Sequence, residues 1–370
     1  MNPFRHGQVV SGEDFCPRPE LMENLTGFMK SGQNVVLLGE RRTGKTSLAC
    51  EAVRANGKRR LLYTDLLEIK SVDDLCKRLI KALVTLERES GFVEKILRSL
   101  SQLKPTLGLD PLTGQPSISL DATVRLKPDS MDGLLDMIEA VHRRKRVIVV
   151  LDEFQDILNL KDCKVALANL RSKVQFHAKI PYVFVGSIRN KMGEIFTHPE
   201  SPFFKSAVSL DVGPLDEEQF LAFLTKKFAR GKRRIDPPAL QCLFALADAV
   251  PGDVQQLCGA LWEITSYKDR ITEKNIPAAL KLIHARELKG YEAMLVLLTD
   301  QQLRCLAGLA RMGGKAPMSS AFVKGVGIML PASIKKALNR LMKLKIIYHH
   351  EGEYKFVNPF FKSWLIYKDY

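Results

Sequence analysis

The feature that most constrains this chain is an eight-residue loop at positions 39–46, which fits the phosphate-binding pattern G-x-x-x-x-G-K-[ST]. An apolar run at 34–38, typical of a buried strand, precedes the loop, and a helical pattern over 45–55 follows it. Glycines let such a loop turn tightly, so that several backbone N–H groups converge on phosphate oxygens at the start of a helix. The context therefore predicts a nucleoside triphosphate site rather than a glycine-rich surface turn.

The side chains of the loop have separate expected roles. Lys45 would place a positive charge against the β- and γ-phosphates, and the Thr46 hydroxyl would bind Mg²⁺. The residues expected to surround the phosphates are Gly39, Glu40, Arg41, Arg42, Thr43, Gly44, Lys45, Thr46 and Ser47.

A second apolar run, at 147–151, ends in two adjacent carboxylates. Sites of open α/β sheets lie at the carboxyl ends of the strands. Asp152 is therefore expected to hold Mg²⁺, often through water, and Glu153 to polarise the attacking water as a general base. Taken alone, such a run is equally typical of a plain strand end. The phosphate loop favours the functional interpretation.

A third short strand is predicted over 181–186 and ends at Ser187. Ser187 would lie beside Asp152, where its hydroxyl could sense the γ-phosphate or hold the water. An equally weighted alternative is that Ser187 caps the next helix.

Length and composition bound the remaining possibilities. A chain of 370 residues should hold two or three domains, and 46% hydrophobic residues are ample for buried cores. The net charge of +15 indicates a polyanionic partner. The seven cysteines are scattered without a C-x-x-C pair, so neither a zinc site nor a disulfide framework is predicted. The first residues lack the apolar core of a signal peptide and no run approaches the roughly eighteen apolar residues of a spanning helix, so the expected location is the cytoplasm, without a membrane partner.

The order of the predicted elements indicates an α/β fold. After a loop and a helix at 19–30, strands and helices alternate over 34–212, which predicts a mainly parallel sheet with helices on both faces. Residues 104–120 read as a protruding β-hairpin, either an exposed insertion or a partner contact.

From 216 to about 287 the periodicity is helical, with no strand candidate. This segment is predicted to form a small helical lid. The positions expected to mark its core are Leu243, Leu246, Val250, Leu257 and Leu261. The expected domains are thus an ATPase core at 1–215, a lid at 216–292 and a winged helix-turn-helix at 293–370.

The last unit carries twelve Lys or Arg residues against five Asp or Glu across 291–370. Helices are predicted at 300–312, 319–324 and 331–343, with a turn at 325–327 and a hairpin of strands at 346–348 and 354–357. One face of the third helix is apolar, with Ile334, Leu338, Leu341 and Met342. The opposite face holds Lys336, Asn339, Arg340 and Lys343. That face either enters a groove of double-stranded DNA or is a solvated basic face on a packing module.

Motifs in the same order resemble those of the archaeal-type ATPases of the signal-transducing STAND branch of AAA+-like P-loop proteins. They are the phosphate loop and the segments at 15–21, 151–155, 186–187, 213–215 and 358–365. The resemblance implies ATP as the nucleotide. It also implies that Phe15, Cys16 and Arg18 lie beside the adenine and ribose, and that Pro251 touches the base.

The chain departs from the pattern of its relatives at three positions. Ala249 stands where the family's lid motif has glycine, and Gln255 stands where origin-recognition initiators carry a lid arginine. Lys205 stands where relatives commonly place an arginine finger. Lysine cannot make the planar bidentate contact of arginine, so slow hydrolysis is expected.

These features together predict a slow, ATP-dependent molecular switch in which nucleotide binds between sheet and lid and moves the basic winged helix. The output would be DNA binding, assembly into a homo-oligomer, or both. One alternative is a DNA-handling AAA+ enzyme, such as an initiator or a transposition or repair ATPase. Another is a signalling or defence scaffold whose winged helix binds protein.

Overall fold

The computed structural model describes residues 2–86, 105–109, 116–120, 128–187, 189–327, 330–350 and 352–370. They form two compact units. The first is Val9–Leu215, and the second is Asp216–Tyr370 together with the N-terminal residues up to Gln8. Each unit is described by itself below.

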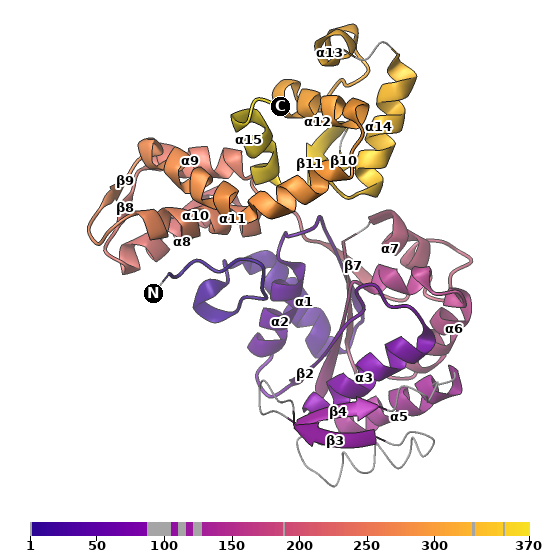
Figure 1. The fold of residues 1–370 in the computed structure, drawn as a ribbon. Helices are drawn as coiled ribbons and strands as arrows, with labels where there is room; N and C mark the ends of the chain where they lie inside the picture. Colours follow the sequence, from indigo (N-terminus) through magenta and orange to yellow (C-terminus); the bar gives the residue numbers. More distant parts are fainter. Residues whose placement is uncertain are drawn as a thin grey trace. The chain divides into compact units, whose positions relative to one another are not determined.

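The first unit is built on a parallel sheet of five strands in the order β2-β5-β6-β1-β7. Its two edge strands, β2 and β7, are labelled in Figure 1. The strands are β1 (Val35–Leu38), β2 (Arg60–Asp65), β5 (Val147–Asp152), β6 (Tyr182–Gly186) and β7 (Val208–Asp211). In the register, Leu38 pairs with Gly186 and Asp65 pairs with Asp152. The carboxyl ends of neighbouring strands therefore meet at one edge, as the alternation of strands and helices predicted.

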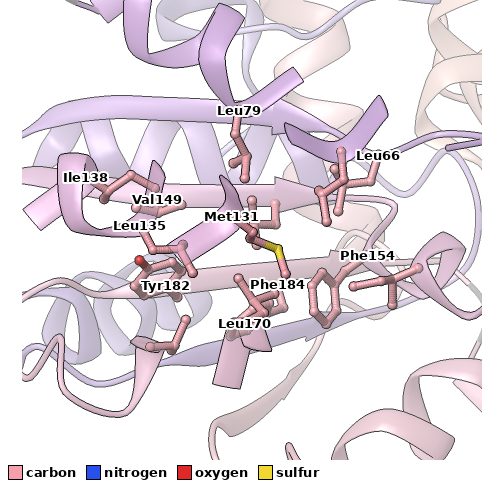
Figure 2. Close-up of a cluster of buried hydrophobic side chains, with 14 of the residues drawn as sticks. Leu66, Leu79, Met131, Leu135, Ile138, Val149, Phe154, Leu170, Tyr182 and Phe184 are labelled. Atoms are coloured by element: carbon pink, nitrogen blue, oxygen red, sulfur yellow. The ribbon is translucent and has the colours of Figure 1, made fainter. Parts of the chain in front are cut away.

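Two hydrophobic clusters cover the two faces of this sheet. The central strands are buried on both sides, so their apolar residues alternate: Val150 and Val183 join one cluster, while Val149 and Phe184 join the other. Helices α1 (Pro19–Ser31) and α2 (Lys45–Ala55) belong to the first cluster. The second cluster holds α3 (Val72–Leu86), α5 (Pro128–Lys145), α6 (Cys163–Val174) and α7 (Arg189–Phe196), and Figure 2 shows part of it.

A separate hairpin pairs β3 (Pro105–Leu109) with β4 (Pro116–Leu120) in antiparallel register. Leu107 lies opposite Ile118. The predicted hairpin is confirmed for these strands, while Lys104 and the residues at 110–115 lie outside the described residues. Its proposed role as a partner contact stays a prediction.

The first part of the second unit is mainly helical. It contains α8 (Glu217–Arg230), α9 (Pro237–Leu246), α10 (Pro251–Ile264), the 3₁₀ helix η3 (Glu273–Asn275) and α11 (Ile276–Val296). Among the predicted core positions, Leu243, Leu257 and Leu261 are fully buried, whereas Leu246 and Val250 are only half-buried.

The prediction that this helical part has no strands is wrong. Two-residue strands β8 (Arg234–Ile235) and β9 (Arg270–Ile271) pair in parallel. The Arg234 N–H donates to the Asp269 carbonyl at 3.0 Å, and the Asp236 N–H to the Ile271 carbonyl at 3.0 Å. Two residues are too few to show a period of two, so only the tertiary fold brings these segments together.

The C-terminal part has the predicted order of helices and a two-stranded wing. It comprises α12 (Asp300–Met312), α13 (Ser320–Val326), α14 (Pro331–Lys343), β10 (Ile347–His350), β11 (Glu353–Phe356) and α15 (Pro359–Tyr367). The turn predicted at 325–327 is shorter than expected, because α13 continues to Val326 and ends on Gly327 at a φ of 65°. Glycine tolerates this left-handed conformation without strain.

Helix α14 shows the two predicted faces. Ile334, Leu338 and Leu341 are fully buried in the winged-helix core, and Met342 is half-buried. Lys336, Asn339, Arg340 and Lys343 are all exposed. The basic face is therefore available to solvent.

The seven cysteines all lie among the described residues, and no disulfide joins any of them there. Across the described part of the chain, no helix has both the length and the apolarity that crossing a bilayer requires.

Candidate active site

The phosphate loop connects β1 to α2, and its backbone needs glycine at two points. Gly44 has a φ of 88° immediately before α2, in the region that glycine adopts freely. At Gly39, a Cβ would lie 2.4 Å from the Val212 carbonyl oxygen, so the loop passes too close to the segment after β7 for any larger residue. Thr43 Oγ1 donates to the Glu40 carbonyl at 2.9 Å and closes the turn.

Lys45 is the first residue of α2 and is buried, with 6% of its surface exposed. Its ammonium donates to the Glu40 carbonyl at 2.6 Å. Burial lowers the pKa of Lys45, while the nearby charges of Glu153 and Asp152 act in the opposite direction. The loop thus holds a buried cation close to the two carboxylates that follow β5.

Asp152 on β5 and Thr46 on α2 are in direct contact. Thr46 Oγ1 donates to Asp152 Oδ2 at 2.7 Å, and the Tyr63 hydroxyl on β2 donates to the same oxygen at 2.9 Å. Burial raises the pKa of Asp152, and these hydrogen bonds partly offset that effect. Tyr63 was not predicted, because β2 carries no local pattern that distinguishes this position.

The oxygen atoms of Thr46 and Asp152 suit Mg²⁺, which prefers hard oxygen ligands. Protein sites for Mg²⁺ usually supply one or two carboxylates and leave the remaining positions to water and substrate phosphates. A hydroxyl and a carboxylate within 2.7 Å of each other at the phosphate loop match that need. No cluster of three or more His, Cys, Asp or Glu side chains suited to a metal occurs among the described residues.

Glu153 and Ser187 are also brought together. Ser187 Oγ donates to Glu153 Oε2 at 2.9 Å, and Ser187 is 8% exposed. Glu153 has a left-handed backbone with a φ of 48° as the chain leaves β5. Helix α7 begins at Arg189, so Ser187 does not directly precede its first residue. Ser187 therefore contacts a predicted site carboxylate, and its role stays a prediction.

The residues predicted to lie near the base have structural contacts of their own. Arg18 is buried, and its guanidinium donates to the carbonyls of Gly213 at 2.8 Å and Thr43 at 3.0 Å. It therefore braces the phosphate loop against the segment after β7. Phe15 and Cys16 lie in the loop just before α1 and are at least partly buried. Their contacts with adenine and ribose stay predictions.

The positions of three further predicted residues do not test their roles, which stay predictions. Ser47 Oγ accepts from the Val10 N–H at 3.1 Å. Pro251 is the first residue of α10 and belongs to the second unit. Lys205 is exposed, and its ammonium lies 5.2 Å from the centre of the Phe204 ring.

Sequence reasoning missed Gln155, although it lies in one of the quoted motifs. Its side-chain amide contacts Glu153 and the backbone of Ser187, and Gln155 is 1% exposed. A glutamine two residues after a strand-end carboxylate carries no general signal, and only the position of β6 reveals the contact.

Comparison with known proteins supports this description. Residues 29–190 match the sequence profile of the AAA domain family, and residues 289–367 match that of a probable winged helix domain. Residues 29–190 thus form an AAA-type P-loop ATPase domain, and residues 289–367 form a winged-helix domain. A comparison with curated proteins found no significant match.

Solved structures share this fold at low sequence identity. A Walker-type ATPase of Pyrococcus abyssi matches with a TM-score of 0.64 at 18% identity, over 99% of this chain and 100% of that one. The ORC1 protein of Aeropyrum pernix, solved in complex with DNA, matches with a TM-score of 0.55 at 15% identity, over 97% of this chain and 94% of that one. The Aeropyrum pernix ORC2 protein, in ADPNP–ADP complexes, has a TM-score of 0.54 at 14% identity, over 99% of both chains.

Proposed function

We propose that this ATPase is a slow molecular switch of the STAND type, in which the nucleotide state controls a DNA-binding winged helix. The observation that carries the catalytic part is the cluster at the carboxyl edge of the sheet. There Lys45, the Thr46–Asp152 pair and the Glu153–Ser187 pair lie at the ends of β1, β5 and β6. Such an edge is where open α/β sheets bind their ligands.

Each member of the cluster has one task in this proposal. Lys45 binds the terminal phosphates, and the backbone N–H groups at the start of α2 orient them. Thr46 and Asp152 would hold Mg²⁺, which neutralises phosphate charge when bound. Glu153 accepts a proton from the attacking water, and the Ser187 hydroxyl orients the Glu153 carboxylate from β6.

Slow turnover is expected because the chain lacks arginine at two positions where related proteins carry it. Lys205 offers a point charge where relatives commonly have an arginine finger, and an arginine finger is worth about 10³–10⁵ in rate. Gln255 replaces the lid arginine of initiators. A protein that retains ATP for a long time is suited to signalling by its bound state, because each state persists.

The DNA contact is proposed from the basic face of α14. Lys336, Arg340 and Lys343 are exposed on one side of this helix, and the opposite side is fixed in the winged-helix core by Ile334 and Leu338. A rigid helix that presents cations outward fits a major groove lined with phosphates. The DNA-bound fold relative, ORC1, supports duplex DNA as the partner to test.

Measurement of ATP turnover with and without duplex DNA tests the switch. We expect slow turnover in both conditions, with DNA affinity that differs between the ATP-bound and ADP-bound protein. Strong stimulation by DNA would favour a DNA-handling enzyme instead. No affinity for duplex at low salt in either state would favour a scaffold whose winged helix binds protein.

Replacement of Lys336, Arg340 and Lys343 with alanine should weaken duplex binding and flatten its salt dependence. Each phosphate contact releases roughly one counterion, so the log–log slope should fall by up to about three. Fluorescence anisotropy over a salt series measures both quantities. The fold should survive because the three side chains are exposed.

A matched control replaces Lys58, Lys161 and Lys164, which are exposed residues of the first unit, with alanine. This variant loses the same formal charge but should keep a slope near that of the wild type. If both triple variants change the slope equally, only net charge matters and α14 is not the DNA contact.

A further inference from the structure

Gln155 occupies an unusual position at the catalytic edge of the sheet. It lies in the 3₁₀ helix η2 (Phe154–Asn159), directly after the strand end that carries Asp152 and Glu153. Its Nε2 donates to Glu153 Oε2 at 2.5 Å, and its Oε1 accepts from the Ser187 N–H at 3.3 Å. One amide therefore joins the general base at the end of β5 to the hydroxyl residue at the end of β6.

The side chain of Gln155 is held firmly in this place. Phe154, between Glu153 and Gln155, is fully buried with its ring centre 4.6 Å from that of Phe184 (Figure 2). Gly186 leaves room for the amide, since a Cβ there would lie 2.8 Å from Gln155 Oε1. Nε2 also lies 3.5 Å from Asp156 Oδ1. A buried amide with such neighbours has little freedom to rotate.

The same carboxylate oxygen receives two hydrogen bonds. Glu153 Oε2 accepts from both Ser187 Oγ and Gln155 Nε2. Two donors from different elements define the plane of a carboxylate better than one donor can, because a single hydrogen bond still allows rotation about the side-chain torsions. The orientation of a general base strongly affects rate, and a displacement of about 1 Å can cost about 100-fold.

We propose that Gln155 is a positioning residue for ATP hydrolysis, whose amide fixes Glu153 and Ser187 in one arrangement and acts on the rate through Glu153. The inference rests on the proposed role of Glu153 as the general base. Gln155 does not touch the reacting atoms in this account. Its effect should therefore appear in kcat and vanish when Glu153 can no longer act as a base.

The first test compares two substitutions of similar size. Gln155→Met removes both hydrogen bonds of the amide, and Gln155→Glu keeps an acceptor for the Ser187 N–H but loses the donor to Glu153. We expect kcat to fall by about 10- to 100-fold in Gln155→Met and by at least as much in Gln155→Glu. The dissociation constant for ATP, measured by calorimetry, should change by less than about twofold.

The second test is a double-mutant cycle with Glu153→Gln. If Gln155 acts through Glu153, then Gln155→Met should change the residual rate of the Glu153→Gln protein by less than about twofold. A merely structural role would lower both rates by the same factor. Asn159→Ala, in the same 3₁₀ helix but with an exposed side chain, is the control that should leave kcat unchanged.

Thermal unfolding of each variant identifies loss of fold. Three results would each overturn the inference while leaving the ATPase proposal intact. They are additive effects in the cycle, an unchanged kcat in Gln155→Met, and a loss of ATP affinity as large as the loss of kcat. Absence of hydrolysis by the wild-type protein would instead overturn the proposed function, and the inference with it.

Discussion

Lys45→Ala is expected to weaken ATP binding by at least about 100-fold, because the variant loses charge-assisted hydrogen bonds to two phosphates, each worth about 1.5–3 kcal/mol. The cation is buried at the start of α2, where water screens its charge poorly. Calorimetric titration with ATP and Mg²⁺ measures the change directly.

The control for this substitution is Lys58→Ala. Lys58 is an exposed residue three positions beyond α2, so its loss should leave the affinity unchanged. A folded Lys45→Ala protein that binds ATP as tightly as the wild type would show that the loop at 39–46 is not the nucleotide site.

Glu153→Gln should separate binding from chemistry. The amide has the shape of the carboxylate but cannot accept a proton, so hydrolysis should slow by about 10²–10⁴. ATP affinity should change little, because Glu153 lies at the end of β5 rather than in the phosphate loop. Single-turnover hydrolysis with radiolabelled ATP, together with calorimetry, measures the two effects.

Glu23→Gln on the exposed side of α1 is the matched control, since it makes the same chemical change at an exposed residue that is not one of the predicted site residues. If Glu153→Gln hydrolyses ATP at the wild-type rate, another carboxylate is the base. Gln155 would then have no catalytic partner, and the cycle described above would show no coupling.

Two residues that contact the predicted carboxylates could not be predicted from the sequence. Tyr63 and Gln155 contact Asp152 and Glu153 respectively, yet neither has a local pattern that marks it. Tyr63 is 89 positions from Asp152, and the contact exists because β2 pairs with β5 in a particular register. A shift of one residue would turn its side chain to the other face of the sheet.

Local sequence patterns, by contrast, were enough to predict the bounds of several helices. Helix α14 has both of its predicted bounds, since Pro331 favours the first position of a helix and the apolar spacing sets one face. The same holds for α2, which begins at Lys45 directly after the glycine of the loop. The short strands β8 and β9 were missed because their two residues pair only through the fold around them.

The sequence alone therefore determined the phosphate loop, the alternation that makes a parallel sheet, and the residues placed at its edge. These depend on turn chemistry and periodicity, which act between near neighbours. Tertiary structure decided which of them touch: Thr46 meets Asp152 across 106 positions, and Ser187 meets Glu153 across 34. Strand order and register set those contacts, and both depend on how the whole core packs.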